Sequence, residues 1–335
     1  MIIVRPLKKS DSEAFINIAF GAVGMTSMPK NKEKLLKRLD IVEHSFAKEA
    51  ITPTDESYLF VLEDLETGVI GGTSGIVAQA ARHSPLFFYR VEYQEKHENI
   101  AHHIRKVPTM RPVQYRHYWS EICSLYIVPD ARQKGAGKLL SLSRFLFIAD
   151  HPHRFTKKIF AEMRGVFDNN LGSPFWDGIG RHFIESDFHT LMQIRDEGTI
   201  DLTQALPTHP IYIEMLPPHV QASIGQVHPE SKPALDMLLR EGFNLSQECD
   251  ICDGGPKIEA DVSNIRTIKE STVAIVSAIT QEEPCEHCSL ISNCKIDFRA
   301  CLAPVNYQPG KGVVISSKTA EALHILKGER VRWLA

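Results

Sequence analysis

The sequence predicts an α+β fold with one mixed sheet, and two observations carry this prediction. Segments with strand and helix character follow one another in the order strand, helix, hairpin, strand, loop, helix, strand, helix. Near the middle of the chain, residues 121–140 read as a buried strand, a tight glycine loop and the start of an apolar helix. A helix that begins at a glycine loop after a strand is a common anion-binding unit. We therefore expect a sheet covered by helices, with a ligand site near its centre.

The loop at residues 132–137 has the pattern R-x-x-G-x-G. Glycines at a helix N-terminus let backbone N–H groups close on an anion, and the helix dipole favours negative charge there. The loop has neither the Walker lysine–Ser/Thr ending nor the Rossmann glycine spacing. We expect it to cradle a pyrophosphate. The expected contacts are Arg132, Lys134, Gly135, Ala136, Gly137 and Lys138.

The other elements follow from hydrophobic periodicity and turn residues. Before the loop we expect a strand at 2–5, helices from residues 10–11 and over 31–48, and a hairpin of 58–63 with 69–77. Residues 82–120 are rich in His, Arg and Tyr without a clear period, which predicts irregular strands and loops. After the loop we expect a strand at 158–163, a helix from residue 173, an insertion at about 187–225 with one helix, a helix over 231–241 and a strand at 243–249.

These elements predict two domains. Residues 1–255 would hold the main sheet, and residues 256–335 would form a small C-terminal β-rich module. The segment from residue 313 reads as strand, short helix, turn and strand, so the module could be a small β-barrel.

Composition excludes several classes of protein. Of the 335 residues, 43% are hydrophobic and 24% are charged, which is ordinary for a globular protein with a sizeable core. The formal net charge of −3 argues against a general nucleic-acid binder. No apolar run approaches the ~20 residues of a membrane span, and the N-terminus lacks a signal core. We expect a cytoplasmic protein without nucleic-acid or membrane partners.

Seven cysteines are an odd number without an evident disulfide framework, which favours a reducing compartment. Two C-x-x-C pairs, Cys249 with Cys252 and Cys285 with Cys288, could hold zinc if their thiolates converged. The pairs are separated by more residues than usual for such a site. Free thiols and no metal are the expectation.

Several blocks together make the chain similar to the arginine N-succinyltransferase family, over residues from Ile3 to about 275. They include MTSMP (25–29), YLFVLED (58–64), EICSLYI (121–127), AEMRG (161–165), SPFWDGIGRHFI (173–184) and QVHPESKPALDMLLREGF (226–243). The resemblance implies a GNAT-like acyl-CoA N-acyltransferase fold, whose mixed sheet splays open where the pantetheine of the coenzyme enters. It also implies transfer of succinyl from succinyl-CoA to the α-amino group of L-arginine, which is the first step of succinyl-dependent arginine catabolism.

The resemblance also implies functions for two residues. The histidine of the V-H-P motif, His228, would be the proton donor, and Leu125 on the C-S-L strand would contact succinyl-CoA. Two places depart from the family pattern, namely Gln226, where an arginine is expected, and the cysteine-rich segment 285–301.

Amine acylation needs a neutral amine, stabilisation of the thioester oxygen and protonation of the departing thiolate. Backbone around Leu125 could bind the oxygen, and Glu121 could take the amine proton, although a solvated strand-end carboxylate is the simpler interpretation. His228 could act as acid or base. Cys123 is expected to be a buried thiol, because no Cys–His–acid set is visible.

An arginine substrate favours an acidic partner for its guanidinium and an arginine for its carboxylate. Candidates in or near the family blocks are Glu162, Arg164, Asp177, Arg181 and Glu214, of which we expect Glu162, Arg164 and Arg181 to bind substrate. Each could equally be a solvated surface charge.

The sequence therefore predicts a succinyl-CoA:L-arginine N-succinyltransferase that works as a homo- or hetero-oligomer of related subunits. Ornithine or another basic amino acid is the alternative acceptor. A non-catalytic acyl-CoA-binding subunit is the alternative of another class, and the presence of both the glycine loop and His228 argues against it.

Overall fold

One mixed sheet runs through the computed structural model, which describes residues 1–98, 103–167, 172–197, 205 and 207–335. Its strand order is β14-β15-β11-β16-β12-β13-β1-β2-β3-β6-β7-β10-β9-β4-β5-β8. The first strands are β1 (Ile2–Pro6), β2 (Ser57–Asp64), β3 (Ile70–Val77), β4 (Leu86–Glu98), β5 (His103–Tyr115), β6 (Ser120–Ile127) and β7 (Lys158–Glu162). They are followed by β8 (Ile211–Tyr212), β9 (Asn244–Asp250), β10 (Pro256–Asp261), β11 (Thr272–Thr280), β12 (Cys288–Ser292), β13 (Ala300–Pro304), β14 (Asn306–Gln308), β15 (Gly312–Ser316) and β16 (Arg330–Leu334). The expected mixed α+β architecture is confirmed.

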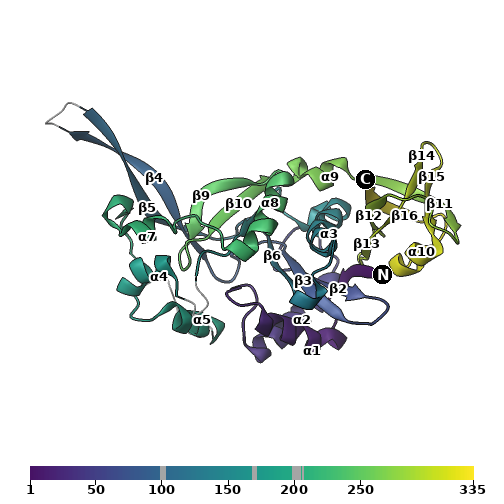
Figure 1. Ribbon diagram of the computed structural model, residues 1–335, viewed down its shortest axis with the longest axis horizontal. Coiled ribbons are helices and arrows are strands. Elements are labelled where there is room, and N and C mark those ends of the chain that lie inside the picture. Colours follow the sequence, from purple (N-terminus) through teal and green to yellow (C-terminus); the bar gives the residue numbers. More distant parts are fainter. Residues whose placement is uncertain (99–102, 168–171, 198–204, 206) are drawn as a thin grey trace.

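Helices cover both faces of the central strands. The helices are α1 (Ser12–Gly21), α2 (Lys32–Ala47), α3 (Ala136–Asp150), α4 (Pro174–Gly178), α5 (Phe188–Glu197), α7 (Pro218–Gln221), α8 (Lys232–Arg240), α9 (Arg266–Glu270) and α10 (Ser317–Leu323). Strand β2 is buried on both sides, because Leu59 and Val61 pack against α1 and α2 while Phe60 and Leu62 pack against α3. Figure 1 shows α1 and α2 on the side of the sheet opposite α3. No helix in the described ranges is long and apolar enough to cross a bilayer.

The central parallel strands β6 and β7 separate after a short contact. Their register pairs Ser120 with Ile159 and Glu121 with Phe160, and the pairing ends there although β6 continues to Ile127. On its other side β6 carries a bulge, since Thr73 pairs with Tyr126 and Gly75 with Cys123. Ser124, which has a φ of 54°, and Leu125 therefore both stand against one residue of β3. The expected opening of the sheet is present at this point.

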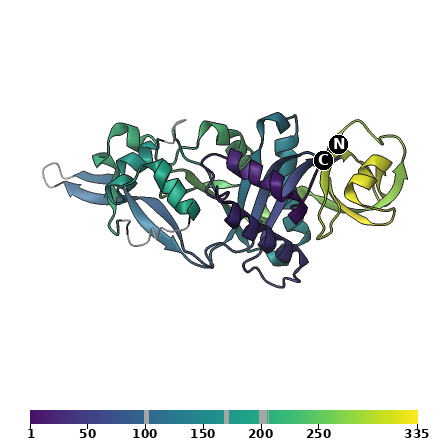
Figure 2. The ribbon, with the colours of Figure 1, turned by 90° about the horizontal axis from the view of Figure 1, so that it is seen from below.

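The segment 82–120 differs from our expectation of irregular structure. It contains β4 and β5, which pair in one register from Leu86↔Tyr115 to Glu98↔His103. Figures 1 and 2 show this hairpin reaching beyond the rest of the chain. Only its inner half is joined to other strands, through β9 at 88–90 and β8 at 109–110. Most of the described side chains in the outer half are exposed, so its sequence has no apolar alternation to reveal strands.

The C-terminal strands β11–β16 and helix α10 have their own apolar core, at the end of the molecule away from the hairpin (Figure 1). Strand β13 joins them to the main sheet by pairing with β1. Within the described residues they form an open run of strands, and no ladder closes the barrel that we considered. Strand β10, which follows the boundary expected at residue 255, pairs with β7 and β9 in the main sheet.

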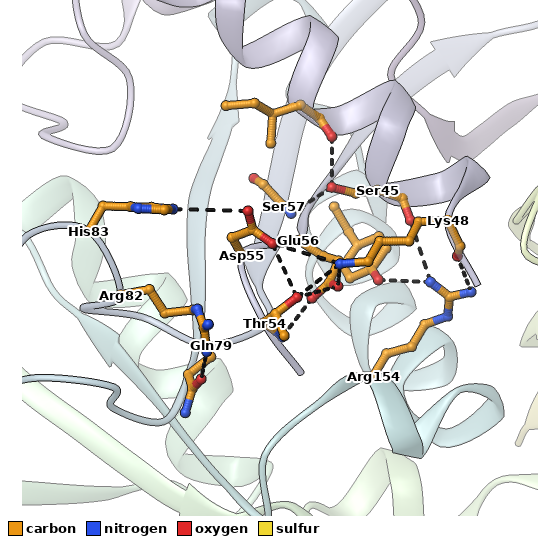
Figure 3. A network of polar contacts seen from close by, with 12 residues as sticks. Ser45, Lys48, Thr54, Asp55, Glu56, Ser57, Gln79, Arg82, His83 and Arg154 are labelled. Carbon is orange, nitrogen blue, oxygen red and sulfur yellow. Dashed lines mark hydrogen bonds and ion pairs between the residues drawn. The ribbon is translucent and has the colours of Figure 1, made fainter. Parts of the chain in front are cut away.

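A network of polar side chains ties the end of α2 to the start of β2 (Figure 3). Glu56 is 2% exposed and accepts from Lys48 Nζ at 2.6 Å and from Thr54 Oγ1 at 2.6 Å. Arg154 donates to the Lys48 carbonyl at 2.9 Å and to the Tyr58 hydroxyl at 3.0 Å. Burial alone would raise the pKa of Glu56, but Lys48 and Thr54 lower it to about 2. The ion pair and hydrogen bonds of Glu56 thus offset the cost of burying its charge.

Candidate active site

The loop between α1 and α2 is bonded to the bulge in β6. The backbone N–H of Ser124 donates to Ser27 Oγ at 3.2 Å. Arg38 of α2 donates to Ser124 Oγ at 3.1 Å and also to the Ser27 carbonyl. These contacts fix the loop next to Leu125, where β6 leaves β7. Sequence analysis missed Ser27 and Arg38, because a serine in a loop and an arginine in a basic helix carry no distinctive signal.

Glu121 and Cys123 lie on the sheet face that carries this loop, and both are half-buried. Burial raises the pKa of Glu121 to about 7, although the charge of Arg38 opposes the shift. Burial, together with the neighbouring Glu121, raises the pKa of Cys123 to about 11. Glu121 can therefore exchange a proton near neutral pH, whereas Cys123 remains a thiol, as expected.

Glu162 shares this face of the sheet. Phe160 pairs with Glu121 across the parallel contact, so the two side chains point the same way. Glu162 lies two residues beyond Phe160 and has the same direction. The β6–β7 contact therefore places two carboxyl side chains on one face, at the point where the strands separate.

His228 is held by Arg164 and Glu230. Arg164 Nη2 lies 2.9 Å from His228 Nδ1 and 2.9 Å from Glu230 Oε2. The Glu230 N–H also donates to Nδ1, at 3.3 Å. Because Arg164 and a backbone N–H can only donate, Nδ1 is the acceptor and the proton of the neutral ring lies on Nε2. Burial, and then the charge of Arg164, lower the pKa of His228.

The same loop reaches the His228 cluster. Arg164 Nη1 donates to the Val23 carbonyl at 2.9 Å, and the His228 N–H donates to the Arg164 carbonyl at 2.8 Å. The Phe167 ring lies against His228, with ring centroids 4.8 Å apart, and close to Gly24. Gly24 has a φ of +70°, and a Cβ there would come within 2.2 Å of Phe167. Residues 23–28 thus contact the bulge and also the two residues, Arg164 and Phe167, that lie against His228.

The glycine loop and its helix are placed as the sequence predicts. Gly135 is the N-cap of α3 with a φ of 89°, and Arg132, Lys134 and Lys138 are exposed. A Cβ on Gly137 would meet nothing within 4 Å, so this first turn is open. The pKa of Glu230, in the histidine segment, is lowered mainly by Arg164, and the charges of His228 and of Arg132 in the loop lower it further.

The remaining acceptor candidates lie elsewhere. Arg181 is exposed and pairs with Asp177 at 3.6 Å, while Glu214 pairs with Arg105 of the β4–β5 hairpin at 2.6 Å. The structure brings Glu121, Leu125, Glu162, Arg164 and His228 to one region, but it shows no contact of Arg181 with them. Sequence analysis also missed Glu230, which looked like an ordinary charge at a helix start.

The C-x-x-C pairs form no metal centre in the described part of the chain, where no three potential ligands of the His, Cys, Asp or Glu type gather. Cys249 and Cys252 are buried, and Cys285 and Cys288 are more accessible. Burial and nearby carboxylates raise the pKa of Cys249 beyond its usual range, so this thiol stays protonated.

A parallel pair of strands that separates beside a bulge, followed by a glycine loop that opens a buried helix, is the architecture of the GNAT-type acyl-CoA N-acyltransferases. The open space between such strands receives the pantetheine arm, and the helix N-terminus receives the pyrophosphate. The fold and site therefore define an acyl-CoA-dependent acyltransferase.

Comparison with known proteins gives the family. Residues 2–267 match the family model described as arginine N-succinyltransferase beta subunit, and residues 269–335 match the model of its C-terminal domain. The chain belongs to the arginine N-succinyltransferase family.

Relatives match over the full length. The chain is 35% identical to arginine N-succinyltransferase subunit beta of Pseudomonas aeruginosa, over 99% of this chain and 97% of that one. It is 34% identical to subunit alpha of the same organism, over all of both chains, and 34% identical to arginine N-succinyltransferase of Escherichia coli, over 99% and 97%. The solved structure of arginine/ornithine succinyltransferase subunit AI from Pseudomonas aeruginosa superposes with a TM-score of 0.91 at 34% identity, covering 100% of this chain and 98% of that one.

Proposed function

We propose that this protein transfers the succinyl group of succinyl-CoA to the α-amino group of L-arginine. One observation carries the proposal: a carboxyl group with a pKa of about 7, Glu121, and a histidine, His228, lie near the two ends of one loop beside the bulge of β6. Acyl transfer to an amine needs a base and an acid on either side of a thioester. The names of the full-length relatives supply the acyl group and the acceptor.

The donor would bind along α3. Its pyrophosphate would accept from backbone N–H groups of 135–137, with Arg132, Lys134 and Lys138 adding positive charge. Its pantetheine would enter the opening between β6 and β7, and the thioester oxygen would accept from backbone at Leu125, which the bulge removes from pairing with β3.

The reaction would proceed by direct attack. Glu121 takes a proton from the substrate ammonium, and the neutral nitrogen attacks the thioester carbonyl carbon. The new C–N bond forms as the carbonyl π electrons move to oxygen. The tetrahedral adduct then gives its second N–H proton to solvent water and expels the thiolate, and the carbonyl is restored as the C–S bond breaks.

His228 would protonate the departing sulfur through Nε2. In the free protein its pKa is lowered, so the neutral ring prevails. Two negative partners favour the charged ring during the reaction, namely Glu230, which already raises the pKa of His228, and the polyanionic coenzyme. Transfer of the Nε2 proton leaves the neutral ring protonated on Nδ1, and proton exchange with solvent then returns the proton to Nε2, so that Arg164 can donate to Nδ1 again. We therefore assign Arg164 to positioning His228 rather than to the substrate carboxylate.

Glu162 remains our proposal for the substrate guanidinium, since it shares the face of Glu121. Arg181 remains a more distant proposal for the substrate carboxylate. Ornithine is the second acceptor to consider, because a structural relative is named arginine/ornithine succinyltransferase. We further propose a cytoplasmic protein, on the odd number of cysteines, that assembles with its own or a related chain, because relatives are named alpha and beta subunits.

Thiol release from succinyl-CoA by the purified protein tests the proposal, with L-arginine, L-ornithine, L-lysine and no acceptor compared side by side. Release that depends on arginine supports the activity, and release with ornithine alone keeps the mechanism and changes the acceptor. Coenzyme binding without release for any acceptor would favour the non-catalytic subunit, and the same assay would then be repeated with a related subunit added.

A further inference from the structure

Arg144, in the middle of α3, is a buried cation without a counter-ion. Its side chain is 1% exposed. Its hydrogen bonds go one turn back along its own helix, from Nε to the Ser141 carbonyl at 3.0 Å and from Nη2 to Ser141 Oγ at 2.9 Å. In the described part of the chain no carboxylate forms an ion pair with it. Burying a charge without a partner is costly, so such a group calls for an explanation.

Two other buried arginines bond to groups outside their own helix or strand. Arg5 is 9% exposed and pairs with Asp11 at 2.7 Å. Arg154 is 7% exposed and donates to backbone carbonyls and to the Tyr58 hydroxyl. Burial lowers the pKa of Arg144 to about 10, so the group still carries its charge at neutral pH. Arg154 also lacks a carboxylate, but its hydrogen bonds reach acceptors on other elements, whereas those of Arg144 in the described part of the chain stay within its own helix.

Arg144 lies on the part of α3 that packs against β3 beside the bulge of β6. Gly137, Ser141 and Arg144 are spaced by four and three residues, so they share one face of α3. Gly137 leaves open space on that face, next to the glycine loop. One turn before Arg144, the Leu140 carbonyl accepts a hydrogen bond from Ser74 Oγ of β3 at 3.1 Å. Ser74 is the β3 residue that stands against the bulge of β6, so this part of α3 lies close to the place where the acyl group would be held.

We propose that Arg144 binds the terminal carboxylate of the acyl group and so makes the donor site selective for thioesters of dicarboxylic acids. A guanidinium fits a carboxylate with two parallel hydrogen bonds, and a buried pair of this kind is stronger than an exposed one. The bound donor would supply the negative charge that the protein leaves out. This inference rests on the proposed function, because it places the acyl end of coenzyme A near the bulge.

The experiment compares succinyl-CoA with butyryl-CoA, a donor of the same chain length whose end is a methyl group. The kcat/KM for arginine-dependent thiol release and the calorimetric Kd are measured for both donors with the wild type, Arg144→Met and Arg144→Lys. The wild type should prefer succinyl-CoA by about 100-fold in kcat/KM. Arg144→Met should remove most of this preference while butyryl transfer is kept, and Arg144→Lys should restore part of it.

Arg154→Met is the matched control, because Arg154 is also buried but belongs to the network of Figure 3. It should lower stability and leave the donor preference unchanged. A parallel loss of both donors in Arg144→Met would mean a structural role and would overturn the proposal. Equal use of both donors by the wild type would overturn it too, even if the variants did not fold. If neither donor reacts, the proposed function fails, and the Kd values alone decide whether the carboxylate is recognised.

Discussion

The cluster around Glu56 and the cluster around His228 both join a helix or loop to the sheet, yet they leave their ionisable groups in opposite states. Glu56 is paired with Lys48 and Thr54, and its pKa falls to about 2. Around the bulge, the pKa of Glu121 rises to about 7 and that of His228 falls, so both shifts favour the neutral forms. Complete pairing fixes charge and stabilises the fold, whereas incomplete pairing leaves groups that can exchange protons at neutral pH.

The largest effect on turnover is expected for His228→Ala. Loss of a general acid should lower kcat by about 100-fold or more, with little change in coenzyme binding. Steady-state kinetics together with a Kd for coenzyme A measure this. His219→Ala, at an exposed histidine of α7, is the control and should keep full activity. Unchanged turnover in His228→Ala would remove this residue from the mechanism.

Glu121→Gln should lower kcat/KM by about 30-fold at pH 8. In the wild type, activity should rise with pH near 7 because Glu121 loses its proton there, and this rise should be absent from the variant. The same variant tests stability. The folded chain keeps this proton up to pH about 7, whereas the unfolded chain loses it near 4.5, so the carboxyl group costs stability as pH rises between these values.

Thermal unfolding should therefore show a higher Tm for Glu121→Gln at pH 8, by about 2 °C, and no difference at pH 4. A pH–rate profile identical to that of the wild type would assign the base to another group.

Arg164→Met should lower kcat by about 10-fold, because the His228 ring loses the donor that orients Nδ1. Removing this positive charge should also raise the pKa of His228, which NMR titration of the ring protons would measure. An unshifted pKa together with a large rise in KM for arginine would return Arg164 to the substrate-binding role.

The smallest effect on turnover is expected for Glu56→Gln, which should leave kcat unchanged and lower the free energy of unfolding at pH 7 by about 1–2 kcal/mol. A depressed carboxyl pKa contributes stability above pH 4.5 that is lost as pH falls toward 2. Denaturant unfolding at pH 7 and pH 2.5 should thus show a difference that shrinks on acidification. If Glu56→Gln lost turnover while its stability stayed unchanged, the Glu56 cluster would have a role in catalysis and the difference between the two clusters would be wrong.

Periodicity predicted the elements that bury one face or sit between clear turn residues. The helix found at Lys32–Ala47 was expected over 31–48, and Gly242, with a φ of 101°, ends the helix expected over 231–241. The hairpin of β4 and β5 was missed, because two-stranded structure exposed on both faces leaves no hydrophobic pattern. Turns and helix caps depend on local sequence, so they could be predicted.

The site divides along the same line. The glycine loop and the V-H-P histidine are local motifs and could be predicted. Contacts between distant segments could not, because nothing in residues 23–28 shows that they contact both β6 and the segment after β7. The solitary charge of Arg144 is likewise invisible in sequence, since only the folded chain shows which acids fail to reach it.

The pairing of β1 with β13 has a consequence for how the chain is made. Strand β1 leaves the ribosome before both of its partners, pairs with β2 on one side, and remains unpaired on the other until the strand that begins at Ala300 is made. Throughout synthesis that edge offers unpaired N–H and C=O groups to any other chain nearby. Release of the C-terminal segment therefore completes the central sheet, and a chain interrupted before residue 300 would carry an open edge prone to aggregation.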